Sequence, residues 1–203
     1  MDRSRELSAI KSRIMRIDPV FKSAIKNFEP CTFGLEKPTI THYQSLIRSV
    51  IAQQVSTAAA RTICGRLQEK CNGSITAAKV AVLSLKELQS IGLTGAKVRT
   101  ISELTEASLS GDINFRKFAH MSDEAIIKDL IPLFGIGRWT VEMFLIFQLG
   151  RLDVWPVDDL AVRRGWDSLH GNSEPIKPKA LNLLGEPFIG MRSVVAWYCW
   201  RAS

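Results

Sequence analysis

The sequence predicts an all-α protein, because apolar residues recur at helical spacing along most of the chain and no strand-like alternation of convincing length occurs. One set follows the positions i, i+3, i+4, i+7 and i+8 of a single helix face: Tyr43, Leu46, Ile47, Val50 and Ile51. Capping residues and glycine turns divide the chain into roughly ten short helices. Residues 32–40 (TFGLEKPTI) are the least regular stretch, where both a loop and a strand remain open.

Side chains that can cap a helix precede four of the expected helices: Thr41, Ser56, Ser84 and Ser122. Gln44 and Glu87 stand three residues after the first and third of these, which predicts a capping box at both starts. The expected helices cover about 42–51, 57–70, 85–91, 96–109, 123–131, 140–149, 159–169 and 188–201. Segment 140–149 is apolar on nearly every side, which predicts a buried central helix.

The composition excludes several classes of protein. The chain has 203 residues, 46% of them apolar and 23% charged, as is typical of a soluble globular protein. It has no run of about 18 apolar residues that could span a membrane, and the polar N-terminus lacks the apolar core of a secretion signal. The four cysteines form no CxxC pair and the three histidines are scattered, so reduced thiols are expected and a Cys/His metal site is poorly supported.

The positive charge is concentrated in the first half of the sequence. Residues 1–100 contain 16 Lys/Arg and 7 Asp/Glu, whereas residues 101–203 contain 11 and 13. A basic half can face a polyanion, most plausibly nucleic acid. No basic run exceeds two residues, so a disordered basic tail is not the binding device.

Two segments carry chemical information. Residues 130–142 (LIPLFGIGRWTVE) predict a helix, a sharp Gly-x-Gly turn and a second helix, whose first amides can attract a phosphate. A weaker version of this hairpin occupies residues 88–101. Downstream, Pro156 precedes Asp158 and Asp159; the first is expected to cap the next helix, leaving the second for chemistry, although both could serve only the helix start.

Together these segments resemble the helix-hairpin-helix DNA glycosylase superfamily, and within it most closely the 3-methyladenine DNA glycosylase II family of alkylation repair. The resemblance extends over about residues 19–201. It implies one glycosylase unit, 1–203, with two helical lobes and an active-site cleft between them. Because no low-complexity linker divides the chain, the lobes must be non-contiguous: a central lobe of about 38–150, and a second lobe of about 1–37 and 151–203.

The resemblance also implies site residues. Asp159 would be the catalytic carboxylate, since Val162, Arg163 and Arg164 follow it at the family's spacing. Trp139 would line the base pocket, with Trp200 and Trp155 at its edge. For Trp200 and Trp155, a role in core packing is an equally good interpretation. The DNA-binding residues would be Gly135, Gly137, Arg138, Thr140, Gln53, Gln54 and Ser56.

The resemblance also bears on the residues that enter the DNA, on the hairpin turn and on a cation site. Gln53 and Gln54 match the place from which family members push a side chain into the DNA stack, a wedge that is often apolar. Phe134 stands where the family commonly has proline, a departure expected to leave the hairpin amides unchanged. The carbonyls of Ile131, Leu133 and Ile136 would hold a structural monovalent cation, and no other cofactor is expected.

The function implied is monofunctional hydrolysis of alkylated purines, such as 3-methyladenine or 7-methylguanine, from duplex DNA, which leaves an abasic site. In lyase relatives a lysine follows the hairpin Gly-x-Gly-x, and here that position is Trp139; Lys97 and Lys128 are expected to be solvated surface charges. Two alternatives remain: a related glycosylase for another damaged base, and a helix-hairpin-helix DNA-binding module without catalysis. The expected partner is double-stranded DNA containing alkylated bases, with no membrane contact. The expected state is a monomer in the bacterial cytoplasm (nucleoid) or the eukaryotic nucleus.

Overall fold

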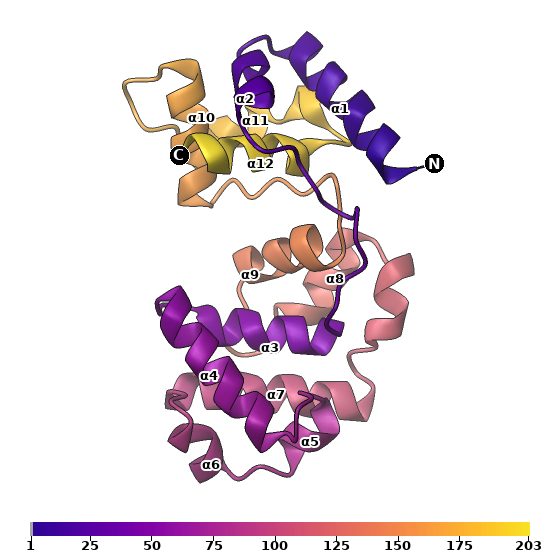
Figure 1. Cartoon of the computed structure of the whole chain (residues 1–203), viewed down its shortest axis with the longest axis vertical. Coiled ribbons are helices and arrows are strands. Elements are labelled where there is room, and N and C mark those ends of the chain that lie inside the picture. Colours follow the sequence, from indigo (N-terminus) through magenta and orange to yellow (C-terminus); the bar gives the residue numbers. More distant parts are fainter. Residues whose placement is uncertain (1) are drawn as a thin grey trace. The chain divides into compact units, whose positions relative to one another are not determined.

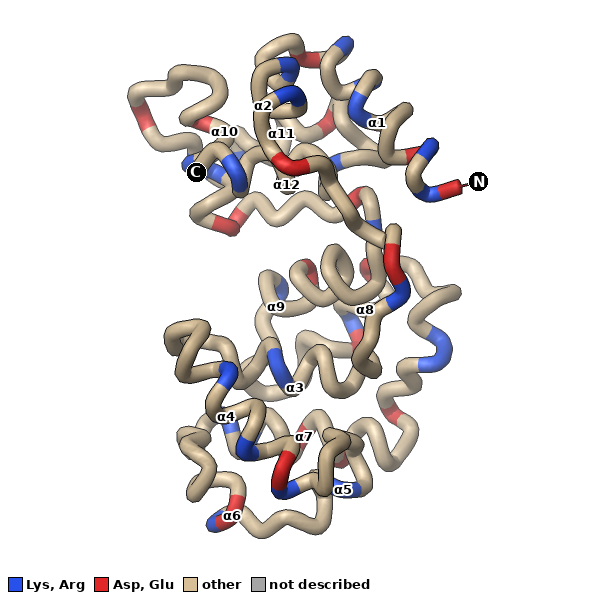
Figure 2. The backbone as a smooth tube through the Cα atoms, viewed as in Figure 1, with Lys and Arg blue, Asp and Glu red and all other residues tan. Residues whose placement is uncertain are grey.

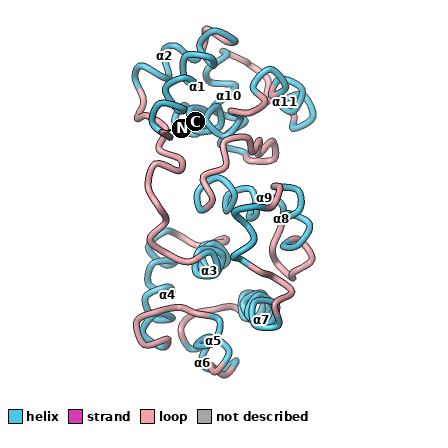
Figure 3. Tube along the Cα trace, turned by 90° about the vertical axis from the view of Figure 1, so that its right-hand side faces the viewer, coloured by secondary structure: helices cyan, strands magenta, loops and turns pink. Residues whose placement is uncertain are grey.

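The computed structural model describes residues 2–203, and the regular structure in that range is entirely helical (Figure 3). The predicted all-α class is therefore confirmed. Residues 32–40 form turns and loop rather than a strand. No helix within the described range combines the length and apolar character needed to cross a membrane.

The chain forms two compact units, one of residues 2–37 with Leu145–Ser203 and the other of Pro38–Phe144. The second boundary thus lies a few residues before the position of about 150 expected from the sequence. Because the first unit is built from both ends of the chain, its core depends on contacts between residues more than a hundred positions apart.

The unit Pro38–Phe144 contains eight helical segments in the described chain, and Figure 1 shows their order. They are α3 (His42–Ala52), α4 (Thr57–Lys70), α5 (Ala77–Ala81), α6 (Leu85–Ser90), α7 (Gly95–Ser110), the 3-10 turn η1 (Phe115–His120), α8 (Asp123–Leu130) and α9 (Arg138–Met143). The apolar face predicted for α3 is buried throughout. Short α5 and η1 were not expected, because neither is long enough to show a helical period.

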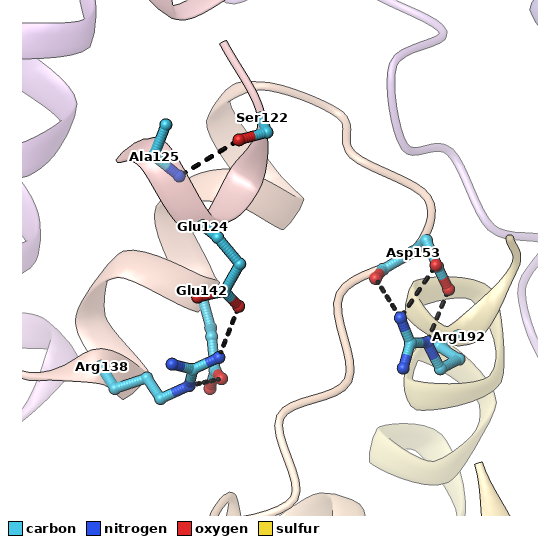
Figure 4. Close-up of polar contacts among 7 residues, drawn as sticks. All are labelled: Ser122, Glu124, Ala125, Arg138, Glu142, Asp153 and Arg192. Carbon is cyan, nitrogen blue, oxygen red and sulfur yellow. Dashed lines mark hydrogen bonds and ion pairs between the residues drawn. The ribbon is translucent and has the colours of Figure 1, made fainter. Parts of the chain in front are cut away.

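The predicted caps fix the starts of these helices. The hydroxyls of Thr41, Ser56, Ser84 and Ser122 each accept a hydrogen bond from a first-turn amide. Figure 4 shows this bond from the Ala125 amide to Ser122. Ser84 and Glu87 form the complete capping box, whereas at Thr41 the structure gives the threonine half. Each cap satisfies an amide that the helix leaves unpaired.

The other unit contains the remaining helices. These are α1 (Arg3–Ile17), α2 (Phe21–Asn27), the π-helical segment η2 (Phe144–Gln148), α10 (Leu160–His170), α11 (Pro178–Leu184), the 3-10 turn η3 (Glu186–Phe188) and α12 (Arg192–Ala202). Phe144, the first residue of η2, belongs to the unit Pro38–Phe144. Helices α1, α2 and α11 were not expected. The backbones of α10 and α12 are in direct contact at Gly165, which has no Cβ. A Cβ there would overlap the carbonyl oxygen of Cys199.

The expected single helix over 140–149 is wrong in detail. The chain is α-helical only to Met143 and then widens into the π-helical segment η2. This change of winding rotates the later residues away from their α-helical positions. As a result Phe147, expected in the interior, has 57% of its surface exposed, whereas Phe144, Leu145 and Ile146 are buried.

Positive charge does not collect on one of the units. Pro38–Phe144 holds 12 Lys/Arg and 9 Asp/Glu, and the remaining residues hold 15 and 11. Lys and Arg lie along helices of both units in Figure 2. The basic first half of the sequence is therefore divided between the two units, because α1 and α2 form one unit with the acidic C-terminal residues.

Candidate functional site: the hairpin, its cavity and Asp159

Helices α8 and α9 form the predicted hairpin. Gly135 has a φ of +73°, and a Cβ there would overlap the hydroxyl of Thr100, so both the conformation and the space require glycine. Ile136 is only 3% exposed and fills the corner between the helices. Gly137 is the N-cap of α9.

Side chains of helix α7 bind the hairpin turn. The amide of Phe134 donates to Glu103 Oε2 at 2.8 Å, and Glu103 Oε1 pairs with Arg99 at 2.8 Å. The Arg99 guanidinium also lies 4.0 Å from the centre of the Phe134 ring. The pKa of the Glu103 carboxyl is held below its ordinary value, chiefly by the hydrogen bond from the Phe134 N–H and next by the hydrogen bond from Arg99. Proline has no N–H, so this anchor requires a residue other than proline at position 134.

The turn after α3 contacts the same hairpin. Gln53 donates through Nε2 to the Gly135 carbonyl at 3.1 Å and to the Thr140 hydroxyl at 3.3 Å. Gln54 is exposed and has a φ of +56°, an uncommon conformation for a side chain other than glycine. The two glutamines therefore differ: the first joins two loops, and the second stands at the tip of a strained turn.

Lys97 holds that turn from α7. Its ammonium donates to the carbonyls of Ile51 and Gln53, each at 2.7 Å, and the residue is only 9% exposed. The expectation that Lys97 is a solvated charge is wrong, because the C-terminal carbonyls of α3 lack intrahelical partners and attract a cation. Burial lowers its pKa from the ordinary lysine value. Lys128 is exposed, as expected.

A cavity of about 570 Å³ lies where these loops meet. It is lined by Ser49, Ala52, Gln53, Gln54, Gly135, Trp139, Thr140 and Met143. Five of the residues expected at the site thus share one cavity, although they are separated by up to 87 positions. Trp139 is 47% exposed, unlike the buried tryptophans 155, 166 and 197. Ser56 is exposed as well, and its hydroxyl caps α4.

Arg138 differs from a free phosphate ligand. Figure 4 shows its guanidinium between two carboxylates, Glu124 at 2.9 Å and Glu142 at 3.1 Å. Glu142 is buried, while Glu124 is exposed. Arg138 therefore ties α8 to α9, and contact with a DNA phosphate would require it to exchange the exposed carboxylate.

Asp159 itself is the N-cap of α10, which corrects the expectation that Asp158 would be the cap. Asp159 Oδ1 accepts from the Val162 amide at 2.9 Å, and the residue is 8% exposed. Asp158 is exposed. The reason is that the chain turns after Pro156, where the Asp159 amide donates to the Pro156 carbonyl, so the helix begins one residue later than expected.

The segment that leads to Asp159 is fastened to the start of α12. Arg192 makes a bidentate pair with Asp153, at 2.6 and 2.8 Å (Figure 4). The buried Ser193 hydroxyl bonds both the amide and the carbonyl of Val154. Such paired bonds fix the direction of an extended segment that has no sheet partner.

The two further tryptophans lie in different surroundings. Trp155 is 7% exposed, donates to the Leu181 carbonyl at 3.0 Å and packs edge-on against Trp166, so core packing accounts for it. Trp200 is half-buried, and its indole nitrogen donates to Asp159 Oδ1 at 3.1 Å. Phe147, which no motif of the sequence singles out, lies against the Trp200 ring. Only the break in helical winding could have singled it out.

The chain closely matches known proteins. A family model described as HhH-GPD superfamily base excision DNA repair protein matches residues 47–188. The chain belongs to this family. It is 36% identical over 166 residues to DNA-3-methyladenine glycosylase 1 of Schizosaccharomyces pombe, covering 79% of this chain and 72% of that protein.

Solved structures agree with this assignment. The S. pombe 3-methyladenine DNA glycosylase in complex with abasic DNA superposes with a TM-score of 0.82 at 30% identity, covering 95% of both chains. A DNA-3-methyladenine glycosidase from Bacillus halodurans gives a TM-score of 0.85 at 30% identity, covering 95% of this chain and 88% of that one. The resemblance drawn from the sequence is therefore confirmed.

Proposed function

We propose that the protein is a monofunctional DNA glycosylase that acts as a monomer and hydrolyses alkylated purines from duplex DNA. Asp159 carries the proposal: it is a buried carboxylate, held by two N–H donors, in the block that follows the hairpin. Membership of a base-excision repair family supports it, and so do the names of the relatives, which are glycosylases for 3-methyladenine.

The hairpin's role is to hold the DNA backbone. The amides near Gly135 and Gly137 bind phosphate oxygens without reading sequence. Reaching a glycosidic bond requires the nucleotide to leave the stack and another group to fill the gap. Exposed Gln54 is suited to fill it, whereas Gln53 is already bonded to the hairpin.

Asp159 supplies the charge that the reaction needs. Breaking the bond between base and sugar builds positive charge on the sugar, as in other glycosidic hydrolyses. A carboxylate stabilises that charge and orients water. An N-alkylated purine is cationic and is already a good leaving group, so no general acid is obligatory.

Trp139 gives selectivity for a cationic base. Its exposed indole borders the cavity, and the face of an indole attracts a cation by about 0.5–2 kcal/mol. A normal, neutral base gains less from this face. The preference for alkylated over undamaged purines then follows from charge rather than from shape alone.

A base-release assay on methylated duplex DNA tests the proposal. Release of 3-methyladenine or 7-methylguanine, with an abasic site left behind, is the expected result. Release of an oxidised or deaminated base instead would identify a related glycosylase with another substrate. Binding without any release would identify a DNA-binding module without catalysis.

Affinity for undamaged duplex is expected to fall steeply with salt and to vary little with sequence. Phosphate contacts dominate such binding, and each one releases counterions that added salt opposes. Fluorescence anisotropy of labelled duplexes measures this affinity at salt concentrations between about 50 and 200 mM, the range in which losses of affinity are large. Binding that resists salt and selects a sequence contradicts the proposed role of the hairpin.

The hairpin also has carbonyl oxygens that could coordinate a monovalent cation. The carbonyls of Ile131, Leu133 and Ile136 follow the C-terminus of α8, where carbonyls lack helical partners. Leu133 accepts from the Ile136 amide at 3.1 Å, which leaves its oxygen a second lone pair. A bound cation would stiffen the turn, and replacing K⁺ by tetramethylammonium at constant ionic strength would then weaken DNA binding.

The enzyme is expected to leave the DNA strand intact. Strand-cutting glycosylases use an amine to form a Schiff base with the sugar, and Trp139 occupies the position of the lyase lysine. Lys97 of α7 is buried, and its ammonium is bonded to the carbonyls of Ile51 and Gln53. Incubation with methylated duplex and borohydride should give no covalent adduct. A trapped adduct, or cleavage without alkali, shows that an amine does attack.

A further inference from the structure

We propose that Trp200 is a positioning residue for Asp159. This inference rests on the proposed function, because it assigns to Trp200 a part in the reaction of that carboxylate. The indole Nε1–H donates to Asp159 Oδ1 at 3.1 Å, and the Val162 amide donates to the same oxygen at 2.9 Å.

Two donors from different helices define the orientation of the carboxylate. The Val162 amide belongs to α10, which Asp159 caps, and the indole belongs to α12. Rotation of the carboxyl group about its Cβ–Cγ bond would lengthen both hydrogen bonds. The indole therefore adds a constraint on this rotation to the one that the capping bond gives.

The indole is itself held in place. The Phe147 ring lies 5.5 Å from the Trp200 ring at 30°, and Phe147 meets Phe33 edge-on at 5.3 Å. One residue before Trp200, the Cys199 carbonyl lies directly against Gly165 of α10. The position of the N–H donor is therefore set by aromatic packing on one side and by backbone contact on the other.

Trp197 offers a matched control on the same helix. Its indole Nε1–H also donates to a single oxygen, the Glu29 carbonyl, at 2.9 Å. Trp197→Phe and Trp200→Phe each keep a ring and remove one N–H. They differ in which oxygen loses its donor, and only Trp200→Phe affects Asp159.

The test is single-turnover release of the methylated base. Trp200→Phe should slow release about tenfold or more, because a hydrogen bond to a charged group is lost. Affinity for an abasic duplex should stay near wild type, and Trp197→Phe should keep the wild-type rate. In the Asp159→Asn background, Trp200→Phe should cause no comparable further loss, since it acts through the carboxylate.

Several outcomes overturn the inference. Equal rates for Trp200→Phe and Trp197→Phe do so, and so does a tenfold further loss in the Asp159→Asn background. A Trp200→Phe variant with normal rate but lost affinity identifies a pocket wall instead.

A readout without activity separates this inference from the proposed function. In ¹H–¹⁵N spectra, Asp159→Asn should move the Trp200 indole resonance and leave that of Trp197 in place. If neither moves, the hydrogen bond is absent and the inference fails, whatever base is released. If wild type releases no base but the resonance moves, the contact stands and the proposed function fails.

Discussion

Asp159→Asn should lower the rate of base release by at least about 100-fold, which is roughly 2.7 kcal/mol of barrier. The substitution keeps the shape of the side chain and removes the charge that stabilises the sugar cation. Asparagine is also a good N-cap, so its Oδ1 can still accept from the Val162 amide and the Trp200 indole. Folding and binding to an abasic-site analogue should therefore survive.

Asp158→Asn is the control for this experiment. Asp158 precedes the cap and is exposed, so its loss should leave the rate near wild type. Single-turnover kinetics and a thermal melt of each variant measure rate and folding separately. An active Asp159→Asn variant beside an inactive Asp158→Asn variant would mean that the wrong carboxylate of the pair has been assigned.

Gly165→Ala should destabilise the protein by about 3 kcal/mol, because overpacking a closed contact forces backbone to move. The new Cβ would overlap the Cys199 carbonyl oxygen, which is rigid helix backbone rather than the end of a flexible side chain. For a chain of this size the loss corresponds to roughly 10 °C in Tm. Scanning calorimetry of the purified variant measures it.

Gly65→Ala is the matched control in another helix. Gly65 is exposed in α4, and a Cβ there would meet nothing within 4 Å. The substitution should stabilise the protein by roughly 0.5–1 kcal/mol, since alanine favours the helix and glycine does not. If both alanine variants melt alike, the contact between α10 and α12 is not as close as the structure has it.

The local signals of the sequence predicted the hairpin and the helix starts well. A serine or threonine caps amides within three residues of itself, so the capping box of Ser84 and Glu87 could be predicted from the sequence alone. Gly135 and Gly137 likewise define a turn through their own backbone freedom. Errors arose where one residue decided the winding: α10 begins after Asp159, not Asp158, and the chain widens into η2 at Phe144.

The sequence by itself determined the helical class, the hairpin and the family, because periodicity, capping and motif spacing are properties of neighbouring residues. Only the tertiary structure decided what each site residue contacts. Lys97 meets carbonyls 44 and 46 positions away, and Trp200 meets Asp159 41 positions away. No local pattern encodes such pairs, since they arise when helices pack and bring distant donors to unpaired oxygens.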